Sequence, residues 1–479
     1  MKKSYMMTMK GLLKDKARII ASAFCSLAFI MGIIYSGRAK ATLKVDHDDL
    51  AVIDTIPVFR FFPTPDSTIS VLPFINDSLC VIKDPEKSMS AFIDELIDLF
   101  NGKDTVVNVV HLGDSHIQAG FLSGRIMRLL HNSFGNAGRG WIAPFKLSKV
   151  NEPNDYFISS NIKEWISGRC VQPNPKCPWG IGGIGIQTEA KDVNFNLIIA
   201  PNNGAGYSFN KVLLYRDNGA LPMIPKYDDR DSVAELSWGR QSFEEIAIDT
   251  FVTKSLIDTF AIRSANVIMD SASIKKSNLY YGFMLMNGNP GLLYHSIGVN
   301  GAKFVDYTSH EYVRRLSLLK PSLIIISLGT NESYGRNFSI SAFEEQVDAF
   351  IRIIREEIPG VSLLITTPAE SFKRTYQNKK RIYVRNENIT KVADVISSYA
   401  EKNGIACWDL FTVSGGNNSC HKWYNAKMFG RDRIHFSIAG YEEQGALLYK
   451  ALMRACTGSE QETAALGDMK QEKEQQDVE

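Results

Sequence analysis

Three polar residues far apart in the chain are of the types that carry out acyl transfer. Ser115 follows the apolar run 105–112, whereas Asp432 and His435 precede the last helix-like segment. Acyl transfer needs a hydroxyl nucleophile, an imidazole that accepts its proton and a carboxylate that holds the imidazole in one tautomer. The Asp-x-x-His spacing lets a single turn of chain bring the carboxylate to the ring. The three residues therefore indicate a serine nucleophile activated by a histidine–aspartate pair.

The same chemistry needs hydrogen-bond donors for the oxygen that becomes negative in the tetrahedral intermediate. The backbone N–H groups of Ser115 and Gly301 and the side-chain amide of Asn331 are candidates. Gly301 lies in the loop 298–302, and Asn331 follows the apolar run 323–328. Each residue alone has an ordinary explanation, as a helix N-cap, a turn residue or a loop residue. Only their combination with a histidine and an aspartate favours catalysis.

The segments that must position these residues alternate between apolar runs and helix-like stretches. Such alternation predicts a parallel sheet covered by helices on both faces, with ligands at the carboxyl ends of the strands. The polar candidates fall on the loops expected there. The pattern assigns 88–144 and 289–456 to one discontinuous domain. The predicted strands are 105–112, 292–296, 323–328, 361–366 and 405–410, and the predicted helices are 88–100, a segment ending near 130, 306–319, 341–357, 384–402 and 439–454.

Residues 145–288 follow a different pattern from the segments on either side. Short apolar runs, such as 196–200 and 211–215, alternate with turns rich in Gly, Pro, Asn and Asp. This pattern is typical of an antiparallel β-sandwich inserted into the first domain. The segment is long enough to have a core of its own.

Four blocks of sequence resemble those of the SGNH (GDSL) hydrolases and occur in that family's order. The blocks are Gly113-Asp114-Ser115, Gly301, Gly329-Thr330-Asn331 and Asp432-x-x-His435. A narrower similarity, to the peptidoglycan O-acetylesterases of Gram-negative bacteria, adds the segments 138–141 and 298–302. This likeness covers about 105–455 of the chain.

The resemblance implies a three-layer α/β/α fold with an inserted β-sandwich like a carbohydrate-binding module. It also implies a serine esterase that removes acetyl groups from the C6 hydroxyl of N-acetylmuramic acid in peptidoglycan, through an acetyl-serine intermediate. Carried over by matching motif, Ser115 is the nucleophile, His435 the base and Asp432 its orienting partner. Gly301 and Asn331 are oxyanion donors together with the Ser115 N–H. No metal or organic cofactor is expected.

Three further residues of these blocks are candidates for the pocket. Asp114 is expected mainly to fix the turn through hydrogen bonds to backbone. His116 either lines the pocket or makes a structural hydrogen bond. Glu332 stands where the general family more often has Asp, and it matches the narrower group.

The overall net charge of +2 hides an uneven distribution. Residues 1–41 hold eight Lys and Arg against one Asp, and residues 457–479 hold two Lys against seven acids, so residues 42–456 are neutral overall. No net positive charge remains to attract nucleic acid, and a nucleic-acid partner is therefore disfavoured. The acidic end 457–479 is expected to be a solvated, disordered tail, and 42–87 a polar connector.

The basic N-terminal end has the features of an export segment. Nineteen uncharged residues, 19–37, follow Arg18, and such a run is about long enough to span a bilayer. Basic residues before it favour a cytoplasmic N-terminus and export of the rest. The segment 39–41 also fits a signal-peptidase site, but the lengths of the basic and apolar regions favour a retained anchor. We therefore expect a periplasmic protein tethered to the inner membrane.

Six cysteines follow the apolar segment, and an even number in an exported chain allows disulfides. Cys170 and Cys177 enclose a proline-containing loop and form the most plausible pair. A zinc site is disfavoured because no Cys-x-x-Cys pair occurs, so we expect either structural thiols or disulfide bridges.

Three other functions fit the same residues. An O-acetyltransferase would use the same triad with a sugar in place of water as acceptor. An esterase could instead act on another acetylated glycan, such as xylan. A non-catalytic glycan-binding wall protein would carry a vestigial triad, which the intact set of Ser115, Asp432 and His435 argues against. No feature of the sequence indicates an oligomeric state.

Overall fold

A six-stranded sheet is the main sheet of the computed structural model, which describes residues 72–476 except 201–205, 227–236, 266–276 and 336. Only the backbone is described for residues 459–476. Five strands are parallel, and β1 runs antiparallel to β19. Their apolar side chains are buried, as expected for a sheet covered on both faces. In sheet order the strands are β1 (Ile82–Lys83), β19 (Ala406–Trp408), β16 (Ser362–Thr366), β15 (Leu323–Ser327), β2 (Val106–Gly113) and β14 (Gly291–Gly298).

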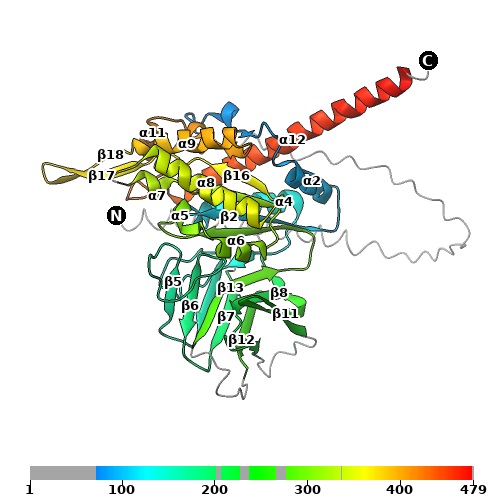
Figure 1. The fold of residues 1–479 in the computed structure, drawn as a ribbon, viewed down its shortest axis with the longest axis vertical. Helices are drawn as coiled ribbons and strands as arrows, with labels where there is room; N and C mark the ends of the chain where they lie inside the picture. The colour runs from blue at the N-terminus through cyan, green and yellow to red at the C-terminus, as the bar shows by residue number, and fades with distance from the viewer. Residues whose placement is uncertain (1–71, 201–205, 227–236, 266–276, 336, 477–479) are drawn as a thin grey trace, which may run out of the picture. The chain divides into compact units, whose positions relative to one another are not determined.

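Two groups of helices contact this sheet (Figure 1). The members of each group also contact one another, so the sheet lies between two helical layers. The mixed α/β fold with a parallel sheet is therefore confirmed. One group is α2 (Ser90–Phe100), α4 (Phe121–Phe134) and α12 (Ile438–Gln476), and the other is α5 (Phe304–Tyr307), α6 (His310–Ser317), α7 (Thr330–Ser333), α8 (Ile340–Glu357) and α9 (Asn388–Lys402). The short elements are η1 (Asp77–Leu79), α3 (Ser115–Gln118), α10 (Leu410–Val413) and α11 (Ser419–Asn425).

Helix α8 shows how the sequence produces these layers. Ser339 caps its first turn by accepting a hydrogen bond from the Ala342 N–H. Phe343, Val347 and Ile354 recur at helical spacing and are buried against the core. The opposite side of the helix is polar, so it can face solvent.

The described residues between 140 and 286 form two antiparallel sheets. Phe195 of the smaller sheet contacts Tyr280 and Phe283 of the larger, so the sheets share an apolar core. This is the segment predicted as an inserted sandwich, and its likeness to a carbohydrate-binding module stays a prediction. The larger sheet has the order β10 (Ser237–Phe243), β11 (Ile246–Ile257), β8 (Phe209–Asp217), β13 (Asn278–Met286), β6 (Ile184–Thr188) and β5 (Ile166–Arg169), with β3 (Gly140–Ile142) paired to β13; the smaller has β4 (Tyr156–Ser160), β7 (Asn194–Ile199), β12 (Thr259–Ser264) and β9 (Met223–Pro225).

The connector predicted at 42–87 ends inside the main sheet. Its β1 pairs with β19, and Cys80 is fully buried in the same core. Asp77 binds the side chains of Lys450 and Arg454 on α12. The last residues of this segment are therefore part of the main-sheet domain, because they complete one edge of the sheet.

Two other predictions are wrong. Cys170 and Cys177 are both free and buried, like the other described cysteines, and each sulfur lies beside the backbone of a different glycine. Residues 457–476 continue helix α12 in place of the predicted disordered tail. Their many Ala, Glu, Gln and Lys residues are good helix formers, which accounts for the difference.

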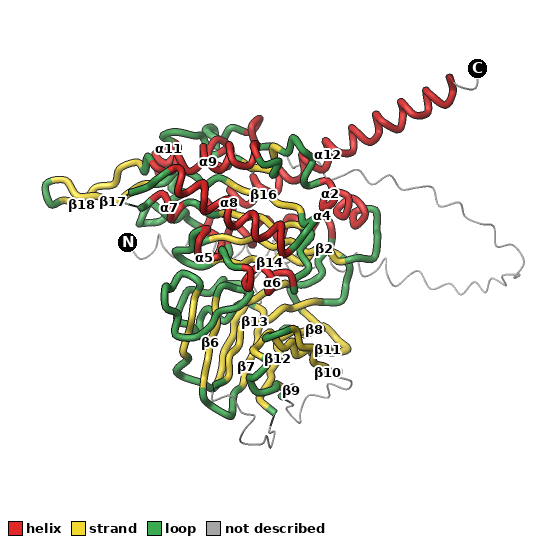
Figure 2. The backbone as a smooth tube through the Cα atoms, viewed as in Figure 1, coloured by secondary structure: helices red, strands yellow, loops and turns green. Residues whose placement is uncertain are grey.

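The helix predicted at 384–402 begins only at Asn388. Residues up to 385 belong to a hairpin of β17 (Phe372–Gln377) and β18 (Lys380–Arg385), visible in Figure 2 as a two-stranded extension. Asn378 and Lys379 form its turn with φ values of 51° and 61°, as a type I′ turn requires. The helix predicted at 306–319 is likewise two helices, α5 and α6, because Ser309 starts a new cap.

Within the described part of the chain, every helix is too short or too polar to cross a bilayer. The export segment predicted at 19–37 lies outside the described residues.

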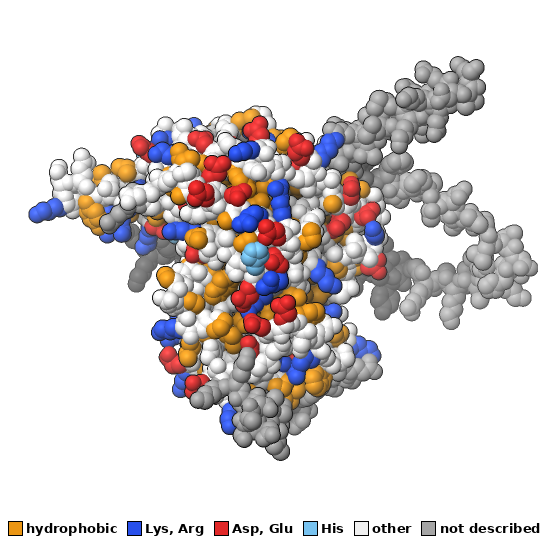
Figure 3. Space-filling view, in the orientation of Figure 1, with side chains coloured by type: hydrophobic (Ala, Val, Ile, Leu, Met, Phe, Trp, Pro, Cys, Tyr) orange, Lys and Arg blue, Asp and Glu red, His pale blue; other side chains and the backbone are white. Residues whose placement is uncertain are grey.

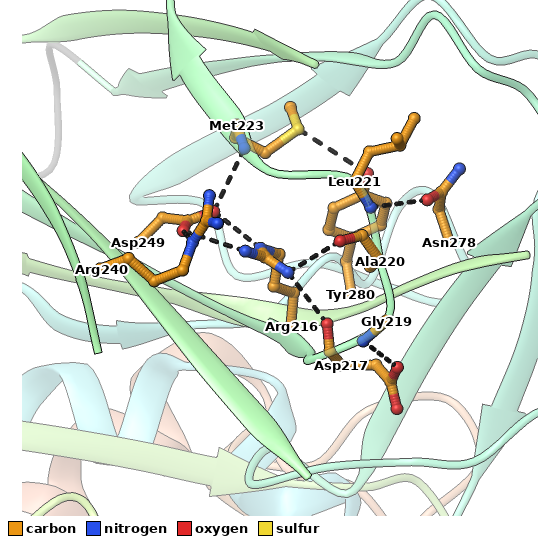
Figure 4. A network of polar contacts seen from close by, with 10 residues as sticks. All are labelled: Arg216, Asp217, Gly219, Ala220, Leu221, Met223, Arg240, Asp249, Asn278 and Tyr280. Carbon is orange, nitrogen blue, oxygen red and sulfur yellow. Dashed lines mark hydrogen bonds and ion pairs between the residues drawn. The ribbon is translucent and has the colours of Figure 1, made fainter. Parts of the chain in front are cut away.

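A buried ion pair joins neighbouring strands β8 and β11 of the larger inserted sheet (Figure 4). The Arg216 guanidinium on β8 donates to both carboxylate oxygens of Asp249 on β11, at 2.7 and 3.1 Å. Both side chains are almost completely buried. Asp249 also accepts hydrogen bonds from Arg240 Nε and from the Met223 N–H. The buried charges are therefore compensated on both sides, which is the condition for a stable buried pair.

Removing one partner of this pair should leave an uncompensated buried charge. We expect Asp249→Ala to lower the free energy of unfolding by about 3–5 kcal/mol, measured by urea denaturation. As a control, Lys149→Ala removes an exposed ion pair with Glu164 and should cost about 1 kcal/mol or less. Equal losses in the two variants would contradict this reading of the buried pair.

Candidate active site

The register of the main sheet brings three of the sequence blocks to one edge. Gly113 of β2 lies beside Gly298 of β14 on one side and beside Ser327 of β15 on the other. The chain segments after these three strands therefore start at the same level. Those segments carry Ser115, the 298–302 loop and Asn331 respectively.

Ser115, His435 and Asp432 form one chain of hydrogen bonds. His435 Nε2 lies 2.8 Å from Ser115 Oγ, and His435 Nδ1 lies 2.6 Å from Asp432 Oδ2. The Asp432 carboxylate and the His435 ring are half-exposed. The serine hydroxyl, imidazole and carboxylate predicted from the sequence therefore meet in the order that proton transfer from the serine requires.

The loop that carries His435 is shaped by Asp432 itself. Asp432 Oδ1 accepts hydrogen bonds from the N–H groups of Ile434 and His435, both at 3.0 Å. Arg433 between them has a φ of +58°, which closes the turn tightly. The spacing in the sequence is thus a local turn that places carboxylate and ring side by side.

The two ionisable groups of this turn stabilise each other's charged forms. Burial by itself raises the pKa of Asp432, but hydrogen bonds from the His435 ring and from two backbone N–H groups outweigh it and hold the pKa well below its ordinary value. The hydrogen bond to Asp432 raises the pKa of His435 above its ordinary 6.5. The carboxylate is therefore ionised at neutral pH and stabilises an imidazolium beside Ser115.

Asn331 reaches the site through contacts that the sequence does not reveal. Its Nδ2 donates to Asp114 Oδ2 at 3.1 Å and to the carbonyl oxygen of Ala302 at 3.0 Å. Asp114 Oδ1 accepts from the N–H of His116, as expected for a residue that fixes the turn. An amide has two hydrogens on its nitrogen, so a third acceptor near Asn331 would have to displace one of these two partners.

Burial raises the pKa of the Asp114 carboxyl to about 7. The same cause raises the pKa of Glu332 to about 7. Glu332 Oε1 accepts from the N–H of Phe304, at the end of the loop that contains Gly301. Glu332, predicted only as a pocket residue, therefore holds this loop in place.

Gly301 lies at the edge of the site with a φ of +87°, a conformation that favours glycine. A Cβ at this position would meet open space, so the backbone here faces solvent. Gln118 fixes the preceding residue, because its Oε1 accepts from the N–H of Asn300 at 2.7 Å. Sequence reasoning missed Gln118, although it follows Ser115 by three residues and so lies near the same face of α3.

His116 is placed beside the triad without joining its hydrogen-bond chain. Its Nδ1 lies 3.0 Å from the Tyr441 hydroxyl, and its ring centroid lies 5.3 Å from that of His435. Burial lowers the pKa of His116 to about 3, so the ring is neutral at physiological pH. The structure contains a hydrogen bond of the structural kind considered for His116, to Tyr441, and the His116 ring also lies next to the His435 ring.

Among the described residues, no cluster of three or more His, Cys, Asp or Glu side chains is arranged to hold a metal ion.

Comparison with known proteins agrees with this geometry. The model of the GDSL-like Lipase/Acylhydrolase family matches residues 280–443. That range contains Gly301, Asn331, Asp432 and His435, whereas Ser115 precedes the inserted segment. A search of curated proteins finds no match.

Among solved structures, one described as "Peptidoglycan O-acetylesterase in action" matches with a TM-score of 0.63 and 20% identity, over 79% of this chain and 99% of that one. A GDSL-like lipase from Bacteroides thetaiotaomicron matches with a TM-score of 0.26 and 16% identity, over 34% and 76% of the two chains. An acetyl esterase variant with acetate gives a TM-score of 0.27 and 14% identity, over 36% and 75%. Almost the whole length of the first of these structures shares the fold of 79% of this chain.

The family match, the shared fold and the converging residues agree with one another. Residues 280–443 are thus similar to the GDSL-like Lipase/Acylhydrolase family, and the fold is that of a solved peptidoglycan O-acetylesterase.

The His435 ring must be neutral to act as the base for Ser115. Its raised pKa sets the pH above which the neutral form predominates. We expect kcat/KM for a simple acetyl ester to be lost as the pH falls through a value above 6.5. Asp432→Asn should move this midpoint to lower pH, because it removes the main cause of the shift, and should lower kcat by about 10⁴-fold. The pH–rate profiles of the two proteins measure both effects. A midpoint that stays unchanged in the variant would show that another group controls it.

Proposed function

We propose that this protein removes O-acetyl groups from cell-wall glycan, through an acetyl-serine intermediate on Ser115. The observation that carries the proposal is the hydrogen-bond chain from Asp432 through His435 to Ser115. The shared fold with a peptidoglycan O-acetylesterase supports peptidoglycan as the glycan. The acetylated position that we propose is the C6 hydroxyl of N-acetylmuramic acid.

The first half of the reaction forms the acetyl-enzyme. His435 Nε2 accepts the Ser115 proton while Oγ attacks the acetyl carbonyl carbon, and Asp432 stabilises the imidazolium that results. The tetrahedral intermediate then breaks its bond to the sugar oxygen. That oxygen leaves with the proton from His435, and the acetyl group stays on Ser115.

The second half releases acetate. His435 accepts a proton from a water molecule, whose oxygen attacks the acetyl carbon. The intermediate breaks its bond to Ser115 Oγ, which recovers the proton from His435. A sugar hydroxyl in place of water would make the same residues an acetyltransferase.

Three groups are proposed to stabilise the negative oxygen in both intermediates. They are the N–H of Ser115 at the start of α3, the N–H of Gly301 and the side-chain amide of Asn331. The hydrogen bonds of Gln118 and Glu332 support this role for Gly301, because they hold its loop beside α3. The backbone N–H groups of Ser115 and Gly301, fixed before the reaction, need no reorganisation when charge develops. The Asn331 amide must instead give up its hydrogen bond to Asp114 or to Ala302.

A periplasmic location with an inner-membrane tether fits this substrate and is part of the proposal. It rests on the basic, then apolar, sequence of residues 1–41.

Replacing the nucleophile should abolish acetate release from the natural polymer. We expect wild-type protein to release acetate from O-acetylated peptidoglycan, and Ser115→Ala to release none above background, because no acetyl-enzyme can form. Saponified peptidoglycan is the control for free acetate. Release from acetylated xylan but not from peptidoglycan would instead favour the alternative glycan substrate.

Removing the Asn331 amide should slow the reaction without abolishing it. We expect Asn331→Ala to lose about 2.7–4 kcal/mol of transition-state stabilisation, a fall in kcat of about 10²–10³. The exposed Asn337, six positions later in the chain, supplies a matched control, since Asn337→Ala should leave kcat unchanged. Equal kcat values for wild type and Asn331→Ala would rule out this amide as an oxyanion donor.

A further inference from the structure

We propose that one face of the β17–β18 hairpin binds an acidic glycan and directs it toward the triad. The inference rests on the proposed function, because it names a feature of the substrate, its carboxylate groups. Residues 372–385 contain six Lys and Arg and no Asp or Glu, although residues 42–456 as a whole are neutral. Figure 3 shows Lys and Arg side chains at the tip of the projection that Figure 1 labels β17 and β18.

The strand register sorts arginine and aromatic side chains onto one face of the hairpin. Alternate residues of a strand point to the same face, and residues paired across the strands share a face. Three successive pairs on one face each combine an aromatic ring with an arginine, and we call this set the Arg–aromatic face. Its pairs are Phe372–Arg385, Arg374–Tyr383 and Tyr376–Arg381, whereas the opposite face carries Lys373–Val384, Thr375–Ile382 and Gln377–Lys380.

The innermost pair fixes the hairpin to the rest of the protein. Phe372 is buried and its ring contacts those of Tyr424 and Phe429. Arg385 donates to the carboxylate of Glu370 at 3.1 Å and to Asn417. These contacts leave the outer pairs projecting from a firm base.

The outer pair is available to a ligand. Tyr376 is 64% exposed, and Arg374 and Arg381 are exposed on the same face. Within the described part of the chain, neither arginine lies within ion-pair distance of an acidic side chain. Two uncompensated guanidinium groups beside an exposed ring therefore point outward.

The Arg–aromatic face is continuous with the loop that carries the triad histidine. Arg433, between Asp432 and His435, places its guanidinium 4.4 Å from the ring centroid of Tyr383. Its carbonyl oxygen accepts from the Phe372 N–H at 3.0 Å. A chain held along this face would therefore run to the side of the triad.

The pattern of this face suits a glycan that carries carboxylates. A guanidinium binds a carboxylate through two parallel hydrogen bonds, and an aromatic ring offers a flat apolar surface to a sugar ring. The peptide stems of peptidoglycan bear free carboxylates at intervals along the glycan. An anionic membrane surface would attract Lys373 and Lys380 on the opposite face as well as it attracts the arginines. Membrane binding therefore does not account for the pairing of arginines with aromatic rings on one face.

A pair of matched double variants tests the proposal in the full-length protein. R374Q/R381Q removes two charges from the Arg–aromatic face, and K373Q/K380Q removes two charges from the opposite face. Co-sedimentation with O-acetylated peptidoglycan measures binding. Acetate release from the same material, compared with hydrolysis of p-nitrophenyl acetate, measures use of the polymer, and thermal melting checks the fold.

We expect R374Q/R381Q to weaken co-sedimentation with peptidoglycan by about tenfold or more. The ratio of kcat/KM on the polymer to kcat/KM on the small ester should fall by about the same factor. K373Q/K380Q should change neither quantity more than twofold. Equal losses in the two variants, or no loss in either, would overturn the proposal. A third outcome would also overturn it: wild-type protein co-sediments with phosphatidylglycerol vesicles, and R374Q/R381Q loses that binding but still binds peptidoglycan.

The same measurements separate this inference from the proposed function. If wild-type protein hydrolyses the small ester but releases no acetate from peptidoglycan, the proposed function fails. The binding arm then still tests the Arg–aromatic face, because sedimentation needs no turnover. If acetate is released equally by wild type and R374Q/R381Q, the function stands and the binding role falls.

Discussion

The hydrogen bond between His435 Nε2 and Ser115 Oγ is the contact on which the site depends, and it joins residues 320 positions apart. It forms because both ends are fixed independently. Ser115 is fixed by β2, whose register with β14 and β15 at Gly113 sets where α3 begins. His435 is fixed by the Asp432 turn. A one-residue shift of β2 would turn alternate side chains to the other face of the sheet and separate the pair.

Two buried carboxyl groups, Asp114 and Glu332, hold the remaining parts of the site, and their burial has a cost in stability. Their pKa values are raised to about 7, so the folded protein binds protons that the unfolded chain releases above about pH 4. The contribution of these two groups to the free energy of unfolding is fully present below about pH 4. It is lost as the pH rises through their folded-state pKa of about 7, because the buried carboxyls then lose their protons. Each carboxyl keeps an oxygen that accepts a hydrogen bond in either protonation state, so the positions of Asn331 and Phe304 persist. Burying Asp114 and Glu332 therefore lowers the stability of the fold at neutral pH, while their hydrogen bonds hold Asn331 and the 298–302 loop in position.

The sequence predicts the strand ends and the Asp432–His435 turn because those features are local, whereas the contact of His435 with Ser115 joins distant segments. Each depends on an apolar run, a turn or a three-residue spacing such as that of Asp432 and His435. The supports of the site are not local, since Gln118 reaches Asn300 and Glu332 reaches Phe304 across long stretches of chain. The sequence could not decide between structural thiols and a Cys170–Cys177 bridge for the same reason, because pairing depends on where two segments pack. The β17–β18 hairpin was not predicted because its alternation is short, and its last two residues, 384–385, were assigned to the following helix.

Arg433 links the hairpin to the chemistry in a second, structural way. Its φ of +58° is unfavourable for a residue with a long side chain, at a cost on the order of 1–3 kcal/mol. The guanidinium compensates by lying near two rings, 4.4 Å from the centroid of Tyr383 and 4.1 Å from that of Tyr424. Because the strained residue sits between Asp432 and His435, these rings stabilise the turn that orients the base. The hairpin is therefore a support of the triad even before any glycan is bound.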